Sequence, residues 1–323
     1  MKNNDKEKLV INVISSMKLR HLKHLAKIFE IQIKGNRKEN YIEHVAQYSI
    51  NNISAIVDNF ITYEEYKFIK ILCDENYTMI LKNESKKSEE IQRSLGDLGL
   101  VYSYLDSNEK TISIPVDIRE NIKSKISNTK TIDYLKKKQN LIDVFKELLD
   151  IYGMIPQNVL IDYMTCIDFE YRVCENIKIL WRYNFRYNLY YDDYKLNYYN
   201  TKIIDRESFN QKLINKLNLN YKYYNLSQLK KMSNEGLNSI EGEICFILKR
   251  YYKSMELILE YLNNIRLMVK NDISSKEISN YVMKKTNKMS EQGKKNIEQL
   301  VDNLRECYPL WTLKGHYLKD LEY

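Results

Sequence analysis

LVYSYLDSNEKTISIPV, residues 100–116, places two runs of strand-like composition on either side of a polar turn. The runs LVYSYL (100–105) and TISIPV (111–116) alternate apolar and polar residues and are rich in β-branched and aromatic side chains, as half-buried strands are. Between them, Asp106-Ser107-Asn108 has the short polar side chains that favour a tight reversal of the chain. The stretch therefore predicts a β-hairpin. After it, Asp117 and Glu120 have the spacing of a capping box and predict a helix.

The residues before this hairpin carry signals of two helices and a further strand. Thr62 and Glu65 have the spacing of a capping box, YTMIL (77–81) is strand-like, and Ser88 is expected to cap a helix that Gly99 closes. The resulting order of helix, strand, helix, strand, turn and strand resembles a winged helix. That resemblance implies a recognition position for residues 88–98 and a wing at 106–110.

The expected recognition helix is a poor match to a phosphate surface. It offers Gln92 and Arg93 to a DNA groove, but Glu89, Glu90 and Asp97 lie beside them. The whole segment 51–126 has ten Lys and Arg against thirteen Asp and Glu, so nucleic-acid phosphates repel it overall. We interpret it as a docking or structural module in which Gln92 and Arg93 are the weaker groove contacts.

The N-terminal stretch SSMKLRHLKHLAKIFEIQIKGNRKENYIEHV, residues 15–45, has the pattern of a helix, an extended loop and a second helix. Leu22 and Leu25 belong to an apolar stripe at helical spacing, and Ile31-Gln32-Ile33 alternates as an extended link does. Gly35 permits the turn, and Asn36 is expected to cap the second helix in a box with Glu39.

This pattern resembles the N-terminal helix–extended-loop–helix module of the Rho transcription terminator and the related SAP domain. An apolar helix, a Gly-x-basic-basic turn and a helix with an aliphatic pair are shared, and the matching residues here are Leu22, Leu25, Ile31, Gly35, Arg37, Lys38, Ile42 and Val45. The resemblance covers residues 15–47 and implies that the module binds nucleic acid or supports a neighbouring binding domain.

Basic residues at the start of the second helix support the same interpretation. Arg37 and Lys38 fall where the helix dipole is positive and disfavours cations, unless an anion binds there. The alternative is that Glu39 and water neutralise both cations on a solvated face. We expect phosphate contacts from six residues, namely Lys18, Arg20, Lys23, Lys34, Arg37 and Lys38.

Net charge is concentrated at the two ends of the chain. Residues 1–50 have ten Lys and Arg against five Asp and Glu, and residues 201–323 have twenty-one against fifteen. The whole chain of 323 residues has a net charge of +8. A polyanionic partner is therefore expected to meet these ends first.

Cysteine content and hydropathy predict a cytoplasmic protein without a membrane span. The five cysteines are scattered, odd in number and without CxxC spacing, so we expect reduced thiols. No apolar run approaches the ~20 residues of a transmembrane helix, and the N-terminus lacks a signal sequence.

The second half of the chain is expected to be helical with a tyrosine-rich sheet. LIDVFKELLDIYG ends at Gly153, and Pro156 fits the first position of the next helix. In residues 181–200 the tyrosines either pack in a sheet or stack on bases while Arg182, Arg186 and Lys195 hold phosphate; we favour the sheet. Ser274 and Glu277 predict a further capped helix.

The tail YPLWTLKGHYLKDLE, residues 308–322, is similar to the end of a group of bacterial proteins with the pattern P-x-W-x-L-x-G-x-(T/S)-P-x-E-L. The matching residues are Pro309, Trp311, Leu313, Gly315 and Leu321. In that group a zinc knuckle, the SEC-C motif, often follows, but no such knuckle occurs in these 323 residues and no zinc site is expected.

Enzymatic motifs are largely missing. No P-loop, dinucleotide-binding, zinc-protease or nucleophile-elbow motif occurs. His21 and His24 have helical metal spacing but no Cys or carboxylate in support. Asp193-Tyr194-Lys195 is the minor candidate for a metal-dependent nuclease, with Asp168, Glu170 or Glu175 as the second carboxylate.

These observations predict a mainly α protein with small β wings. We expect a non-enzymatic, cofactor-free and metal-free protein that binds nucleic acid, most simply duplex DNA, in transcriptional control or in plasmid or phage replication and maintenance. The alternative is a helical protein–protein adaptor that uses the winged helix and the C-terminal helices. The expected domains are 1–50 (SAP/Rho-like), 51–126 (winged-helix-like), 127–139 (linker), 140–245 (second helical or winged-helix-like, Tyr-rich) and 246–323 (C-terminal helical).

Overall fold

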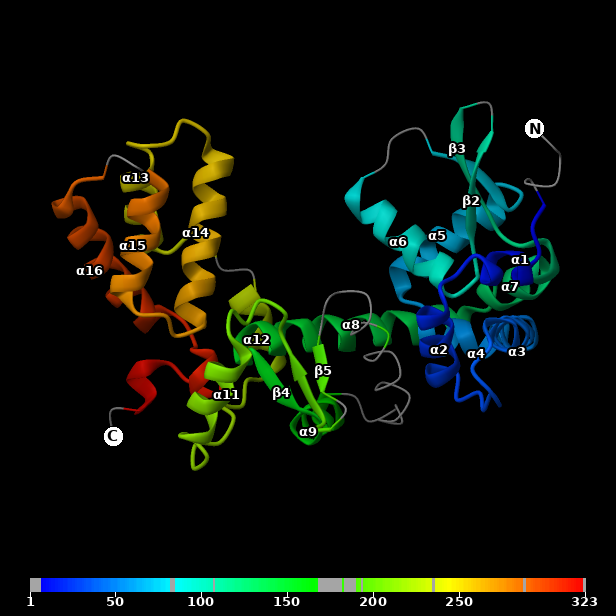
Figure 1. The fold of residues 1–323 in the computed structure, drawn as a ribbon, viewed down its shortest axis with the longest axis horizontal. Coiled ribbons are helices and arrows are strands. Elements are labelled where there is room, and N and C mark those ends of the chain that lie inside the picture. Colours follow the sequence, from blue (N-terminus) through cyan, green and yellow to red (C-terminus); the bar gives the residue numbers. More distant parts are fainter. Residues whose placement is uncertain are drawn as a thin grey trace. The chain divides into compact units, whose positions relative to one another are not determined.

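The protein is mainly helical and has two small three-stranded sheets (Figure 1). The computed structural model describes residues 7–81, 85–106, 108–167, 182, 190–192, 194–233, 236–286 and 289–321. Contacts divide the chain into a first unit of residues 1–142 and 170–186 and a second unit of residues 143–169 and 187–323. The predicted fold class is confirmed.

The first unit begins with four helices that precede its sheet. They are α1 (Val10–Ser15), α2 (Leu19–Ile28), α3 (Lys38–Asn51) and α4 (Ile53–Phe60). The apolar stripe predicted in the N-terminal stretch is buried, because Leu22, Leu25 and Ala26 on α2 face the core while the cations of α2 point to solvent. The extended link and the positive φ of Gly35 are present as predicted.

The rest of the first unit contains the hairpin. Its elements are α5 (Tyr63–Asp74), β1 (Thr78–Ile80), α6 (Lys86–Asp97), β2 (Tyr102–Asp106), β3 (Glu109–Ser113), the 3-10 turn η2 (Val116–Ile118), α7 (Arg119–Ile126) and the first part of α8 (Thr129–Tyr152). The strands are antiparallel in the order β1-β3-β2, with Tyr102 opposite Ser113 and Asp106 opposite Glu109. The predicted order of helix, strand, helix and two strands is therefore present.

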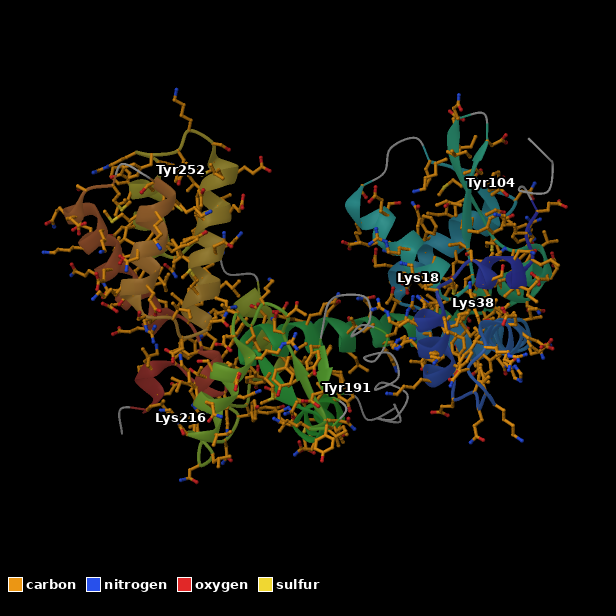
Figure 2. The ribbon with its side chains drawn as sticks, in the orientation of Figure 1. Lys18, Lys38, Tyr104, Tyr191, Lys216 and Tyr252 are labelled. Carbon is orange, nitrogen blue, oxygen red and sulfur yellow. The ribbon has the colours of Figure 1, made fainter. Side chains whose placement is uncertain are left out.

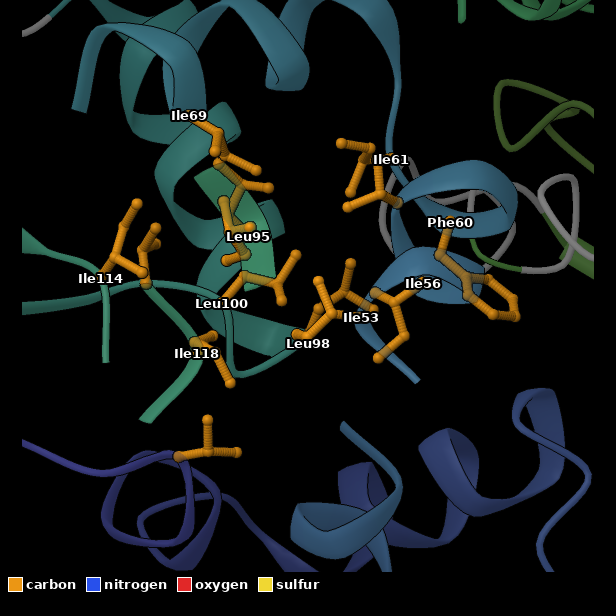
Figure 3. Packing of buried hydrophobic residues seen from close by; sticks show 14 of the residues in the cluster. Ile53, Ile56, Phe60, Ile61, Ile69, Leu95, Leu98, Leu100, Ile114 and Ile118 are labelled. Atoms are coloured by element: carbon orange, nitrogen blue, oxygen red, sulfur yellow. The ribbon is translucent and has the colours of Figure 1, made fainter. Parts of the chain in front are cut away.

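One hydrophobic core runs through the first unit. It joins Val10 and Ile14 of α1 to Ile53 and Phe60 of α4 and reaches Leu135 of α8. Figure 3 shows the part of this core where α4, α5 and α6 meet the residues after the hairpin. Segments 1–50 and 51–126, which the sequence predicts as separate domains, thus contribute to the same core.

Two helix caps in this unit differ from those that the sequence predicts. Ser85, not Ser88, caps α6, because the Ser85 Oγ accepts the N–H of Ser88 at 3.2 Å. Asp117, predicted to cap the helix that follows it, serves another helix: its carboxylate accepts the N–H of Val10, the first residue of α1, at 3.1 Å. By contrast, the capping box of Thr62 and Glu65 on α5 is confirmed.

The second unit contains a small sheet followed by a helical bundle. After the end of α8, its elements are β4 (Met154–Pro156), α9 (Gln157–Ile167), β5 (Tyr190–Asp192), β6 (Asn197–Tyr199), α11 (Arg206–Ile214), α12 (Leu226–Ser233), α13 (Ser239–Leu248), α14 (Met255–Lys270), α15 (Ser275–Thr286), α16 (Glu291–Cys307) and the 3-10 turns η3 (Trp311–Leu313) and η4 (Leu318–Leu321). Pro156 belongs to β4, so α9 starts one residue later than predicted. The predicted domain boundary at 245 falls inside α13.

The two sheets have the same topology. In each unit a helix leads into a short strand, a second helix and then a hairpin, and the last strand of the hairpin lies in the middle of the sheet. The order β4-β6-β5 of the second unit therefore repeats the order β1-β3-β2 of the first.

The tail residues close the end of α8 within the second unit. The Trp311 indole N–H donates to the carbonyl of Asp150 at 2.8 Å, and the Trp311 ring packs on Gly153, whose φ is +67°. Gly315 in turn lies against the ring of Tyr152. The pattern recognised in the tail therefore holds residues that pack this part of the fold.

Candidate nucleic-acid interface

A basic residue occupies the N-cap position of both α2 and α3, and neither helix start has a side-chain cap. Lys18 is the N-cap of α2 and Arg37 is the N-cap of α3, and neither makes a capping hydrogen bond. The expected cap at Asn36 is wrong: α3 begins one residue later, and the Asn36 Oδ1 accepts from the Lys23 Nζ at 3.3 Å. Both helix starts therefore keep N–H groups that no capping side chain occupies.

Contacts from Lys38 and Lys23 bring these two helix starts together. The Lys38 Nζ donates to the carbonyl of Ser15 at 2.9 Å, so the first residue of α3 lies beside the turn that leads to Lys18 (Figure 2). The Lys23 Nζ also lies 5.9 Å from the centre of the Tyr41 ring on α3. Together, the six predicted phosphate-binding residues form what we call the α2–α3 basic surface: Lys18, Arg20, Lys23, Lys34, Arg37 and Lys38.

None of these six residues forms a salt bridge with a carboxylate of the described part of the chain. Lys23 and Lys38 bond to neutral oxygens, so their charge is not cancelled there. Lys18, Arg20, Lys34 and Arg37 are exposed, and their charged groups have no hydrogen-bond partner among the described residues. Glu39 forms no salt bridge with Arg37 or Lys38 among the described residues, so in the alternative of a solvated face water alone would neutralise these cations.

Two adjoining hollows extend this surface toward the hairpin. One, of about 590 Å³, is lined by Lys8, Lys18 and Arg20, and the other, of about 430 Å³, by Arg93 and Lys110. They share five lining residues: Gly96, Asp97, Val101, Tyr102 and Ser103. We call this pair the α6–β2 hollow.

The hollow brings Gln92 and Arg93, the weaker predicted DNA contacts, next to the α2–α3 basic surface. Arg93 is exposed on α6, whereas Gln92 is 8% exposed and donates its Nε2–H to the Ser88 Oγ at 3.1 Å. Arg93 is therefore the better placed of the two to meet a ligand. The acidic residues at the hollow are Glu89 and Asp97, and the Asp97 carbonyl shares a hydrogen bond of 3.0 Å with the His21 Nε2.

Parts of the hollow come from distant segments that no motif in the sequence connects. Lys8 precedes α1 and Lys110 lies on β3, and both line it. The Lys8 N–H donates to the Tyr102 hydroxyl on β2 at 3.1 Å, which ties the start of the described chain to the hairpin. No local pattern in the sequence reports such a contact; only the basic character of the first fifty residues points toward it.

Arg182 and two tyrosines of residues 190–199 are buried in the fold, whereas Tyr190 is 40% exposed and Tyr194 is 96% exposed. Arg182 is 4% exposed and donates from Nη2 to the Glu65 Oε1 at 2.7 Å, so the disfavoured alternative, in which Arg182 holds phosphate, is wrong for this residue. Tyr198 and Tyr199 are buried in the second sheet, as the favoured interpretation predicts. Arg186 lies outside the described residues.

Of the residues proposed for a nuclease site, the structure describes Lys195 but none of the carboxylates. Lys195 lies in the turn between β5 and β6, where its backbone N–H donates to the Asp192 Oδ1 at 3.1 Å. Asp193 and the possible second carboxylates Asp168, Glu170 and Glu175 lie outside the described residues. Within the described part of the chain, no group of three His, Cys, Asp or Glu residues is arranged to hold a metal ion.

Comparisons with protein-family models, with curated proteins and with solved structures give no match to this chain. Among the described helices, none combines the length and apolar character that crossing a bilayer requires.

Proposed function

We propose that the protein is a non-enzymatic, cytoplasmic DNA-binding protein that grips the phosphate backbone of a duplex through the α2–α3 basic surface. The observation that supports it most is the pair of helix starts at Lys18 and Arg37, each basic and uncapped, held side by side by the contact of Lys38 with Ser15. Transcriptional control, or the replication and maintenance of a plasmid or phage, would use such binding.

Electrostatics explains why this arrangement suits phosphate. A cation at a helix start opposes the helix dipole, and a missing cap leaves N–H donors without a partner. A phosphate oxygen bound there accepts from the N–H groups and neutralises Lys18 or Arg37 at the same time. The ligand thus offsets two unfavourable features of the free protein.

The α6–β2 hollow supplies a second line of contact in the same unit. Arg93 and Lys110 extend the positive lining from the helix starts toward β2 and β3. The order of helices and strands around the hollow resembles that of a winged helix, and we propose that α6 takes the recognition position. Because α6 also carries Glu89 and Asp97, we propose backbone contact by Arg93 and little reading of base sequence.

The proposal is tested by removing two charges that have no structural partner. Replacing Arg20 and Arg37 with alanine leaves every described side-chain contact in place, so the fold is retained. We expect weaker binding to all duplex sequences alike, and a salt dependence whose slope falls by about 0.9 for each phosphate that the variant no longer binds. The measurement is fluorescence anisotropy of labelled duplexes from 50 to 300 mM salt.

The matched control replaces Lys70 and Lys130, two exposed lysines of the first unit outside the α2–α3 basic surface. This variant has the same net charge as the Arg20 and Arg37 variant and should bind nearly as the parent does. Equal weakening in both variants would mean that net charge alone, and not this surface, attracts the duplex.

The alternative function is that of a helical adaptor for another protein. Large apolar side chains exposed on the second unit favour it, among them Phe246 on α13 and Met255 on α14. An adaptor would leave random duplex DNA unretarded in a gel at 50 mM salt. A nuclease would instead consume the duplex when Mg²⁺ is added, and Asp193→Ala would stop that loss.

A further inference from the structure

One end of the helical bundle in the second unit gathers basic residues from three segments. The connection from α13 to α14 contains Lys249, Arg250 and Lys253, and the end of α15 contains Lys284 and Lys285. The start of α16 adds Lys294 and Lys295. We call the segments 249–253, 284–286 and 289–295 the basic bundle end.

Helix packing brings these segments to the same end. The connection between α14 and α15 is only four residues long, so the two helices run antiparallel and the end of α15 lies beside the start of α14 (Figure 1). A hydrogen bond of 3.3 Å from Asn264 to the Tyr281 hydroxyl fixes their register. Tyr252, which lies in the α13–α14 connection and is labelled in Figure 2, stacks on Tyr261 of α14 at 4.7 Å between ring centres.

The basic bundle end has few acidic residues to neutralise it. The carboxylates of residues 249–256 and 284–295 are Glu256 and Glu291, and Glu291 approaches the Lys294 Nζ at 4.0 Å. The other cations form no salt bridge with a carboxylate of the described residues; they are Lys249, Arg250, Lys253, Lys284, Lys285 and Lys295. A dense, unneutralised set of charges repels itself and is stabilised by a polyanion.

An aromatic ring orients one of these cations. Phe246, on the last turn of α13, is 62% exposed, and the Arg250 guanidinium lies 5.3 Å from the centre of its ring. A guanidinium that rests on an aromatic ring keeps its N–H groups available for phosphate oxygens.

We infer that the basic bundle end is a second surface for the phosphate backbone of nucleic acid, separate from the α2–α3 basic surface. The inference rests on the proposed function, because both surfaces take the same class of ligand. It adds that the second unit contributes its own contacts, so that one chain binds through both of its units. Binding is then tighter than either surface alone provides.

The test uses the full-length protein with Lys249, Arg250 and Lys253 replaced by alanine. All three side chains are exposed in a connection between helices, so the helices keep their packing. We expect the affinity for a 60-base-pair duplex at 100 mM salt to fall at least tenfold, and the salt slope to fall by about 2 to 3. The control replaces Lys202, Lys216 and Lys276, three exposed lysines elsewhere in the second unit (Figure 2 labels Lys216), and should change the affinity less than threefold.

Two further measurements distinguish a failure of this inference from a failure of the proposed function. If the Arg20 and Arg37 variant binds weakly while the bundle-end variant binds as the parent does, the second surface is refuted and the proposed function stands. If the parent itself does not bind duplex DNA, both fail. Binding of the parent to vesicles of anionic phospholipid that disappears in the bundle-end variant, with DNA binding unchanged, would assign the surface to membranes and overturn the inference.

Discussion

Trp311 and Gly153 are in direct contact, and the indole fills the space that a side chain at position 153 would need. A Cβ built on Gly153 would lie 2.6 Å from the Trp311 Cγ, and the φ of Gly153 is +67°. Two independent constraints therefore select glycine at this position: a left-handed backbone and the closeness of the ring.

Gly153→Ala is expected to destabilise the second unit. Left-handed strain and overpacking together cost about 2–5 kcal/mol of unfolding free energy. Thermal and urea unfolding measure this loss. The control is Gly242→Ala in α13, where a Cβ meets nothing within 4 Å; there we expect a gain of about 0.5–1 kcal/mol. A Gly153→Ala protein as stable as the parent would show that Trp311 is not held against the end of α8.

Glu241 gives the second unit an acid-sensitive contact. It is fully buried, accepts from the Arg266 Nη2 at 2.7 Å, and also bonds to the Tyr308 hydroxyl. Burial alone would raise the pKa of Glu241, but the hydrogen bonds from Arg266 and Tyr308 outweigh it and hold that pKa below its usual value.

A carboxylate with a lowered pKa in the folded state stabilises the fold at neutral pH. That contribution is complete above the pKa of the unfolded chain and is lost as the pH falls through the folded pKa. We expect the unfolding free energy to decrease below about pH 5. In Glu241→Gln, urea unfolding between pH 3 and pH 7 should show a smaller decrease; an unchanged pH profile would mean that other carboxylates cause it.

Arg182→Met is expected to destabilise the first unit by about 3–5 kcal/mol, because it leaves the buried carboxylate of Glu65 without its cation. The double variant Glu65→Gln, Arg182→Met removes the buried charge as well and keeps a capping side chain on α5. Urea unfolding should therefore recover part of the lost stability in the double variant. No recovery would mean that Arg182 acts through packing and not through Glu65.

Arg37→Ser should separate stability from binding. Serine at the N-cap of α3 accepts a first-turn N–H, which adds about 0.5–1 kcal/mol to the unfolding free energy. The same change removes a phosphate contact, and the serine hydroxyl occupies an N–H group that a phosphate would otherwise bind. The affinity for duplex DNA should therefore fall. Thr62→Ala, which removes the cap of α5, should lower stability without changing binding at fixed folded concentration. A serine variant that gains stability and binds DNA as before would exclude Arg37 from the interface.

Local signals in the sequence predicted the parts of the fold that depend on near neighbours. The hairpin of residues 102–113 and the capping boxes at Thr62 and Ser274 each depend on residues within a few positions, and all three are confirmed. Gly99 and Gly153 also have the positive φ expected after a helix. Such contacts are predictable from the sequence because the covalent chain holds residues a few positions apart close together.

Hydrogen bonds between residues far apart in the sequence could not be predicted in this way. Asp117 has the spacing of a local cap, yet its carboxylate serves Val10 at the other end of the unit. Asn36 was expected to cap α3, yet it binds Lys23 on the preceding helix. In both cases a side chain suited to a local bond has a better-placed donor from a distant segment, and only the packed core decides between them.

In the candidate site, too, local features were predictable from the sequence and those set by packing were not. The exposure of Lys18, Arg20 and Arg37 follows from the apolar stripe that buries the opposite face of α2 and from the turn at Gly35. The sequence places Gln92 beside Arg93 at a groove; Gln92 does line the hollow, but it is only 8% exposed and its amide bonds to Ser88. A one-residue step along a helix rotates the side chain by about 100°, which a segment-level prediction does not resolve.

The shared core of the first unit has a practical consequence for dissecting the protein. Val10 and Ile14 pack with Ile118, and the N–H of Val116 donates to the Lys8 carbonyl at 3.1 Å, so the earliest described residues are fastened to the segment after the hairpin. A fragment cut near residue 50 would carry the basic helices away from most of the apolar surface that shapes them. Fragments 1–60 and 61–186, which together contain all of the first unit and keep Arg182 with Glu65, should instead reassociate when produced together, whereas either one by itself should aggregate or remain unfolded.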